Sequence, residues 1–137
     1  MVKVELEGLM AFRAESSTGL SFVMDASADV GGAGLGVSPV EALLASAAAC
    51  SGMDVMSILR KKKQVVTSYR LEVDGERAHE GEWPRPFSSI TINHILTGEN
   101  LDPAAVARAV ELSDEKYCTV VATLRVSPKI VTNWQVL

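Results

Sequence analysis

The chain has 137 residues, of which 47% are hydrophobic and 22% charged, and its formal net charge is −4. This length fits one domain that buries its own core, and we expect a single domain over residues 1–137. The mild acidity argues against nucleic acid as a partner, because phosphate binding needs a basic surface.

Two further features bear on location. No apolar run has the length that crosses a bilayer. The N-terminus alternates like a strand and has no apolar stretch of the signal-peptide kind. We therefore expect a cytoplasmic protein with no membrane partner. In that compartment, two cysteines are packing residues, metal ligands or redox-active thiols.

The first part of the chain favours strands. Residues 2–14 alternate between apolar and polar side chains and predict a strand with a kink or turn near Gly8. A turn follows, and residues 20–24 predict a second strand. Glycines recur through residues 27–37, where we expect a mobile loop.

A long helix is predicted next. Ser38, Pro39 and Glu41 are placed as N-cap, first helical residue and capping-box acid. No helix-breaking residue other than Gly52 follows until about Lys63, so we expect the helix to extend that far. Small side chains fill residues 45–52, so another segment of chain has to approach closely there. Since apolar residues occupy most sides, we interpret this helix as buried and central.

The remainder mixes both kinds of element. Asp102 and Pro103 are typical of a helix start, and a break at residues 113–114 separates that helix from a shorter one. In order, we expect a strand at 65–73, a turn at 74–75, a strand at 87–96, helices from 103 and over 117–124, and a last strand at 130–136. The fold class is therefore α+β, with helices packed on an antiparallel sheet.

The two cysteines lie in different surroundings. Cys50 lies inside the long helix, where a free cysteine is often a small packing residue. Cys118 lies beside Lys116 near a helix start, where the dipole and the ammonium favour thiolate and a lower pKa; packing is the alternative. His79 and His94 have no partner motif and the cysteine spacing matches no zinc pattern, so we expect no metal and no cofactor.

Two segments are similar to a known family. Residues 38–50 resemble the helix that carries the peroxidatic cysteine of the OsmC/Ohr family, and residues 115–120 resemble its second cysteine motif. The glycine loop and the helix at residue 103 also fall where that family places them. The last strand and residues 77–85 resemble the OsmC-like branch more than the Ohr branch.

The resemblance implies a fold and an activity. Family members are intertwined homodimers whose antiparallel sheets pack around two central helices. Here it implies a peroxidase of oxidative stress defence, in which an organic hydroperoxide oxidises Cys50 and Cys118 resolves the product to a disulfide. A dithiol reductant then restores the pair.

One departure concerns activation of the thiol. The family carries a glutamate directly after the helix-opening proline, where this chain has Val40, and an arginine from an N-terminal loop, for which Arg13 is the nearest match. Glu41 lies nine residues before Cys50, on the opposite side of the helix, and suits the cap better than the site. Asp54 is one turn after Cys50 and shares its face; an acid there raises a thiol's pKa.

Other functions fit the same pattern. The chain is alternatively a non-catalytic dimer of this fold that binds a small apolar ligand at the subunit interface, or a purely structural dimer. Val40 favours these alternatives, whereas the two cysteine motifs favour the enzyme.

Overall fold

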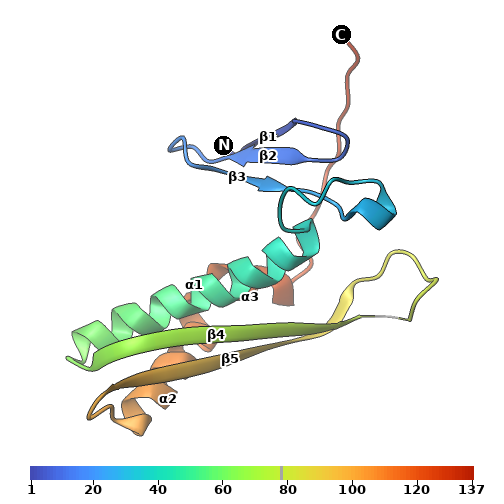
Figure 1. Cartoon of the computed structure of the whole chain (residues 1–137). Helices are drawn as coiled ribbons and strands as arrows, with labels where there is room; N and C mark the ends of the chain where they lie inside the picture. The colour runs from blue at the N-terminus through green and yellow to red at the C-terminus, as the bar shows by residue number, and fades with distance from the viewer. Residues whose placement is uncertain (78) are drawn as a thin grey trace. The chain divides into compact units, whose positions relative to one another are not determined.

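The computed structural model describes residues 1–77 and 79–137. The chain divides into two compact units, Met1–Ala45 and Ser46–Leu137. Each is considered by itself (Figure 1). The single domain expected over 1–137 stays a prediction.

The N-terminal unit is built on a three-stranded antiparallel sheet in the order β1-β2-β3. Its strands are β1 Lys3–Leu6, β2 Phe12–Glu15 and β3 Ser21–Met24. The predicted kink or turn near Gly8 is a turn, and it divides the segment into two antiparallel strands. The Glu7 N–H donates to the Ala11 carbonyl at 2.8 Å across that reversal.

Asp25 organises the glycine-rich loop that follows β3. Its side chain is buried and accepts hydrogen bonds from the backbone N–H groups of Ala26, Ala33 and Leu35 at 2.7, 3.1 and 3.1 Å. One turn of 3-10 helix, η1 Ala28–Val30, lies inside the loop. The backbone hydrogen bonds hold the pKa of Asp25 below its usual value. The loop is therefore arranged around a buried carboxylate.

The long helix is α1, Pro39–Lys61. Its predicted capping box is confirmed: the Glu41 carboxylate accepts from the Ser38 N–H at 3.0 Å and from the Ser38 hydroxyl at 2.7 Å. Only one side of the helix is buried within the chain, whereas Met53 is 72% exposed. The interpretation of α1 as buried on most sides is therefore wrong for the single chain.

By length and composition alone, α1 qualifies as a membrane-crossing helix, which corrects the expectation that no run is long enough. Core helices of soluble proteins pass the same test. Here α1 carries Asp54 at mid-helix and packs Val55 and Leu59 into a protein core, which is the arrangement of a core helix.

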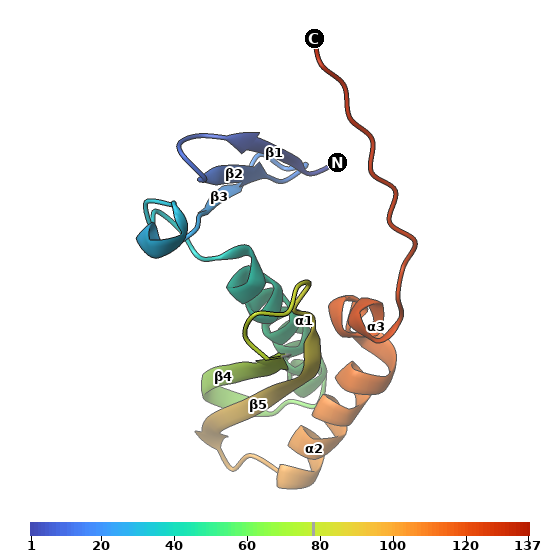
Figure 2. The same ribbon diagram turned by 90° about the vertical axis from the view of Figure 1, so that its right-hand side faces the viewer.

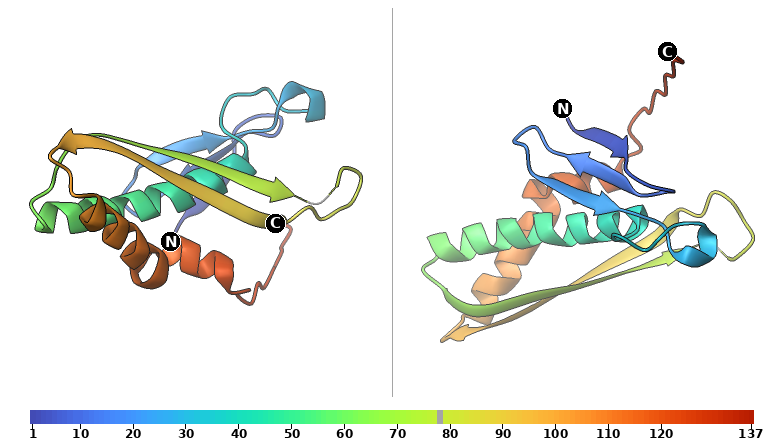
Figure 3. Two further views of the ribbon diagram at one scale, coloured as in Figure 1. Left: turned by 90° about the horizontal axis from the view of Figure 1, so that it is seen from below. Right: turned by 45° about the horizontal axis from the view of Figure 1, so that its top comes forward.

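A long hairpin forms the sheet of the C-terminal unit. Strands β4 Val65–Arg77 and β5 Phe87–Glu99 pair along their whole length, with Asp74 opposite Thr91 and Gly75 opposite Ile90. The predicted turn at residues 74–75 is wrong, because cross-strand pairing continues through it. Figures 2 and 3 show α1 and helix α2, Pro103–Leu112, against one face of this hairpin.

The core of this unit lies between the two helices and the hairpin. Its fully packed members are Val55 and Leu59 of α1 with Ala105 and Ala109 of α2. The start of α2 is fixed as predicted, since the Asp102 carboxylate accepts from the Ala104 N–H at 2.9 Å and Pro103 follows. This packing determines which face of α1 lies against α2 and against the segment that follows α2.

After α2 the chain makes one wide turn, η2 Ser113–Tyr117, and enters the short helix α3, Thr119–Arg125. The predicted short helix is therefore confirmed. The predicted break at residues 113–114 is a change from α-helix to a wider helical turn, and the chain leaves helical conformation only at Cys118. Residues 126–137 run as extended chain without a strand among the residues described, so the predicted last strand is wrong for the isolated chain. A strand needs a partner for its backbone groups, and here this segment has none in the sheets of its own chain. The mixed α+β class with antiparallel sheets is confirmed.

Candidate functional site

Cys50, Asp54 and Cys118 meet in the C-terminal unit. Cys50 and Asp54 are one turn apart on α1, and Cys118 is the residue directly before α3. The two Sγ atoms and a carboxylate oxygen of Asp54 all lie within 4.8 Å of one another. The small side chains of residues 45–52 explain the approach, since the Cys118 Sγ lies 4.0 Å from the carbonyl oxygen of Ala47. Two residues 68 positions apart therefore share one site.

The two thiols differ in accessibility. Both are free, but Cys118 is only 2% exposed whereas Cys50 is half-buried. Burial raises the pKa of the Cys118 thiol, and the neighbouring Cys50 and Asp54 raise it further. The lower pKa expected from Lys116 and the helix start is therefore wrong, because desolvation outweighs the backbone hydrogen bond at Val121 that lowers the pKa. Cys118 is held as a protonated thiol beside a more accessible partner.

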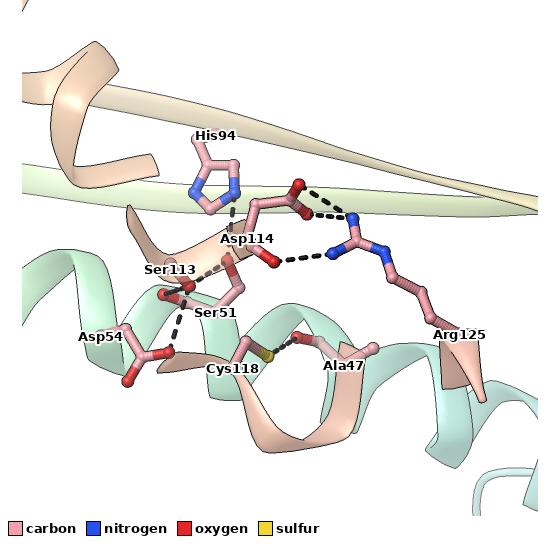
Figure 4. A network of polar contacts seen from close by, with 8 residues as sticks. All are labelled: Ala47, Ser51, Asp54, His94, Ser113, Asp114, Cys118 and Arg125. Carbon is pink, nitrogen blue, oxygen red and sulfur yellow. Dashed lines mark hydrogen bonds and ion pairs between the residues drawn. The ribbon is translucent and has the colours of Figure 1, made fainter. Parts of the chain in front are cut away.

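A chain of polar side chains begins at Asp54 (Figure 4). The Ser113 hydroxyl lies 3.1 Å from the Asp54 carboxylate and 3.0 Å from the Ser51 hydroxyl. Ser51 in turn lies 3.5 Å from Nε2 of His94, and Nδ1 of His94 is 2.6 Å from the Tyr69 hydroxyl. The network links α1, η2 and the hairpin, and it places a fixed carboxylate beside the two sulfurs.

Burial also shapes the hairpin end of this network. It lowers the pKa of His94, which the charge of Asp114 partly offsets, so the ring is favoured in its neutral form. It raises the pKa of Tyr69 to about 12. A neutral imidazole has one donor and one acceptor nitrogen, which lets His94 bridge the Tyr69 and Ser51 hydroxyls.

The turn that carries Ser113 is tied to α3. Arg125 donates to both carboxylate oxygens of Asp114, at 2.7 and 2.8 Å, and to its backbone carbonyl at 2.7 Å. This bidentate pair closes the end of α3 onto η2 (Figure 4). Cys118 lies between these two elements, so its position depends on the same contact.

Of this network, the sequence pointed to Asp54 but not to Ser51, Ser113, His94 or Tyr69. His94 has no partner motif in the sequence. The available signal was its place between Ile92 and Leu96, on the inward-facing side of β5, where a polar residue needs a partner. Ser113 carried no signal beyond marking a break.

Two expected site residues have other partners in the N-terminal unit. The Glu41 carboxylate is held by the cap, and hydrogen bonds from Ser38 keep its pKa below the usual value. The Arg13 guanidinium pairs with Glu7 and donates to the Ser21 hydroxyl at 3.2 Å. The pairing with Glu7 raises the pKa of Arg13, which keeps its charge. A role for either residue in the chemistry of Cys50 stays a prediction.

A groove of about 650 Å³ lies along α1 and β4. Apolar side chains such as Met53, Met56 and Leu71 line it, with Arg60 and Lys61 contributing positive charge. Cys50 and Cys118 are not among its lining residues. The groove is thus a feature separate from the sulfurs.

Known proteins resemble this chain over most of its length. The OsmC-like protein family model matches residues 31–133. Protein YhfA of Escherichia coli K12 is 41% identical over 133 residues, which cover 96% of this chain and 93% of YhfA. A hypothetical protein from Aquifex aeolicus has a crystal structure with a TM-score of 0.77 at 33% identity, covering 91% of this chain and 86% of its own. An OsmC organic hydroperoxide resistance protein from Legionella pneumophila matches in fold, with a TM-score of 0.65 at 17% identity, covering 91% of this chain and 89% of its own.

Proposed function

Because the chain belongs to the OsmC-like protein family, we propose that it is a thiol-dependent peroxidase that reduces organic hydroperoxides through Cys50 and Cys118. The observation that carries the proposal is the meeting of two free sulfurs within 4.8 Å, one half-buried and one buried. A hydroperoxide resistance protein of the same fold supports the substrate class.

In the first step, the peroxide reacts with the more accessible sulfur, which is that of Cys50. The Cys50 thiolate attacks the distal oxygen of the hydroperoxide, the O–O bond breaks, and the alkoxide leaves as an alcohol once it takes a proton. Cys50 becomes a sulfenic acid. Cys118 does not compete for the peroxide, because it is buried and its pKa is raised.

The second step uses the buried sulfur as the resolving thiol. Cys118 attacks the sulfenic sulfur of Cys50, a disulfide forms and water leaves. The sulfurs, which lie within 4.8 Å of each other, approach in this step to about 2.05 Å, the length of a disulfide bond. A dithiol reductant then exchanges with the disulfide and restores both thiols. The net reaction converts one hydroperoxide and one dithiol into an alcohol, water and a disulfide.

Asp54 supplies the proton acceptor in this proposal. Its carboxylate lies beside both sulfurs and is held by Ser113. It takes the proton of the Cys50 thiol to give the attacking thiolate, and it returns that proton to the departing alkoxide. The role replaces the glutamate that the family places at the position of Val40.

The proposal includes a location and an assembly. Free thiols persist in a reducing compartment, which supports a cytoplasmic location. The exposed apolar side chains of the C-terminal segment, such as Trp134 at 86%, favour a homodimer that covers them. The cytoplasm would also supply the dithiol reductant.

Turnover tests the function directly. Purified protein with an alkyl hydroperoxide and a dithiol should consume the peroxide catalytically. Cys50→Ser should abolish consumption, and Cys118→Ser should allow one turnover before activity stops or slows. An Asp74→Asn variant, altered on the exposed face of β4, should match the wild type. Consumption that survives Cys50→Ser would refute the proposal.

The groove supports a second candidate function, the binding of a small apolar ligand. Its methionine and leucine lining suits an apolar body, and Arg60 and Lys61 suit an acidic head group. Binding of a fatty acid that is unaffected by Cys50→Ser but weakened by Arg60→Gln, in a protein without peroxide turnover, would favour this function over the enzyme.

A further inference from the structure

The sulfurs and the carboxylate of the candidate site also form a metal-ligand set. Cys50 Sγ, an Asp54 oxygen and Cys118 Sγ lie within 4.8 Å of one another, on side chains that are half-buried or buried. Two thiols and a carboxylate are a donor set that suits Zn²⁺ and similar thiophilic cations. The sequence did not predict this set, because its members are far apart along the chain.

The geometry lies close to that of a tetrahedral zinc site. Zinc bonds of about 2.3 Å to sulfur and about 2.0–2.2 Å to oxygen place neighbouring ligand atoms about 3.5–3.8 Å apart. The three atoms here need to close by at most about 1.0–1.3 Å to reach those separations. Cys50 and Asp54 are spaced i, i+4 on α1, so both side chains leave the helix on one face.

The surroundings orient the ligands as outer-shell groups do in metal sites. Ser113 holds the Asp54 carboxylate at 3.1 Å and contacts Ser51. The Arg125–Asp114 pair fixes the two elements on either side of Cys118. Ligands on a rigid helix, and on a turn held in place by an ion pair, lose little conformational freedom when a cation binds.

We propose that the reduced protein binds one Zn²⁺ through Cys50, Asp54 and Cys118, with a fourth position open to water or another small ligand. Binding replaces the two thiol protons: one Zn²⁺ with two thiols and one carboxylate gives the metal complex and two protons. The inference uses the same thiols as the proposed function but does not rest on peroxide turnover.

The composition of the site suits a cation. All three donor groups become anionic ligands when a metal binds, and they lie within 4.8 Å of one another on side chains that are half-buried or buried. A divalent cation offsets most of that negative charge. Metal and disulfide exclude each other, because the disulfide uses up both sulfur ligands. Zinc therefore protects the thiols from oxidation, and oxidation releases zinc.

The test uses the reduced full chain without oxygen or added thiol. Co²⁺ serves as the probe, because thiolate ligands give it a charge-transfer band and tetrahedral coordination gives strong visible bands. We expect one Co²⁺ per chain, displaced by Zn²⁺. Cys50→Ser and Cys118→Ser should each weaken Zn²⁺ binding at least about 100-fold, and Asp54→Asn should weaken it about 10-fold or more. The control Asp74→Asn should leave it unchanged.

A second measurement needs no variant. Zn²⁺ at one equivalent should slow alkylation of Cys50 in the wild-type protein, and protein oxidised to the disulfide should bind no Co²⁺. Absence of the charge-transfer band, or zinc binding that survives both cysteine variants, would overturn the inference. Peroxide turnover in a protein that binds no metal would leave the proposed function standing, whereas metal binding without turnover would refute the function alone.

Discussion

At the scale of single residues, the hydroxyl of Ser113 joins the turn after α2 to the middle of α1. It is fully buried and contacts the Ser51 hydroxyl, the Ser51 carbonyl and the Asp54 carboxylate at 3.0, 3.4 and 3.1 Å. A buried polar group without a partner costs free energy. The stability of this region therefore depends on one small side chain.

Replacing Ser113 by alanine should lower the free energy of unfolding by about 1–3 kcal/mol, because Ser51 and Asp54 lose a buried partner. Urea unfolding measures the change. Ser89→Ala provides the matched control, since that hydroxyl bonds Glu76 on the exposed side of the hairpin. An S113A variant as stable as S89A would contradict the account of the network.

Asp54 can be tested by its effect on the first chemical step. If it takes the proton of Cys50, Asp54→Asn should slow oxidation of Cys50 by about 100-fold or more, since general bases typically contribute that much. Stopped-flow oxidation by an alkyl hydroperoxide under single-turnover conditions measures it. A faster reaction in the variant would show that the carboxylate only repels the thiolate.

At the scale of elements, both long helices follow from their start signals. Ser38, Glu41 and Asp102 make the cap contacts that their positions predicted. The turn predicted at Asp74 and Gly75 is wrong, because pairing of β4 with β5 outweighs a local turn preference. The sequence pointed to the two cysteines and Asp54, which the structure brings together, and their roles stay a prediction. Ser51, Ser113 and His94 were missed, because only the packing of α1 against η2 and β5 brings them together.

Asp25 makes the glycine loop a pH-sensitive element. Its pKa in the folded chain is below the usual 3.8, chiefly through the Leu35 N–H. Its stabilising effect is therefore complete above the unfolded-state pKa and is lost as the pH falls through the folded value. Asp25→Asn should lower the melting temperature at neutral pH and reduce the loss of stability on acidification, as followed by circular dichroism.

The exposed Asp74→Asn substitution is the matched control, expected to change neither the melting temperature nor its dependence on pH. If Asp25→Asn behaved like Asp74→Asn, the buried carboxylate would not be what arranges the loop.

At the scale of the whole molecule, apolar surface at the C-terminal end is unusually open. Ile130, Trp134 and Val136 are 84–86% exposed in a segment predicted to be a strand. Among the residues that the structure describes, this segment joins neither sheet. A second copy of the chain can supply both the strand partner and the apolar cover.

We therefore expect the full chain to sediment as a dimer at micromolar concentration, and removal of residues 130–137 to shift it toward the monomer. Trp134→Ser should weaken the dimer at least about tenfold, because it removes a large exposed apolar side chain. Analytical ultracentrifugation measures both. A full chain that sediments as a monomer would contradict the proposed dimer. That result would not bear on the proposed chemistry of the cysteines.

The central claim is that Cys50 and Cys118 act as one redox pair, and the mass of the intact protein after one equivalent of an alkyl hydroperoxide tests it most directly. The wild type should lose two hydrogens as the disulfide forms, and Cys118→Ser should instead gain one oxygen on Cys50. An unchanged wild-type mass, or the same loss of two hydrogens in Cys118→Ser, would contradict the account.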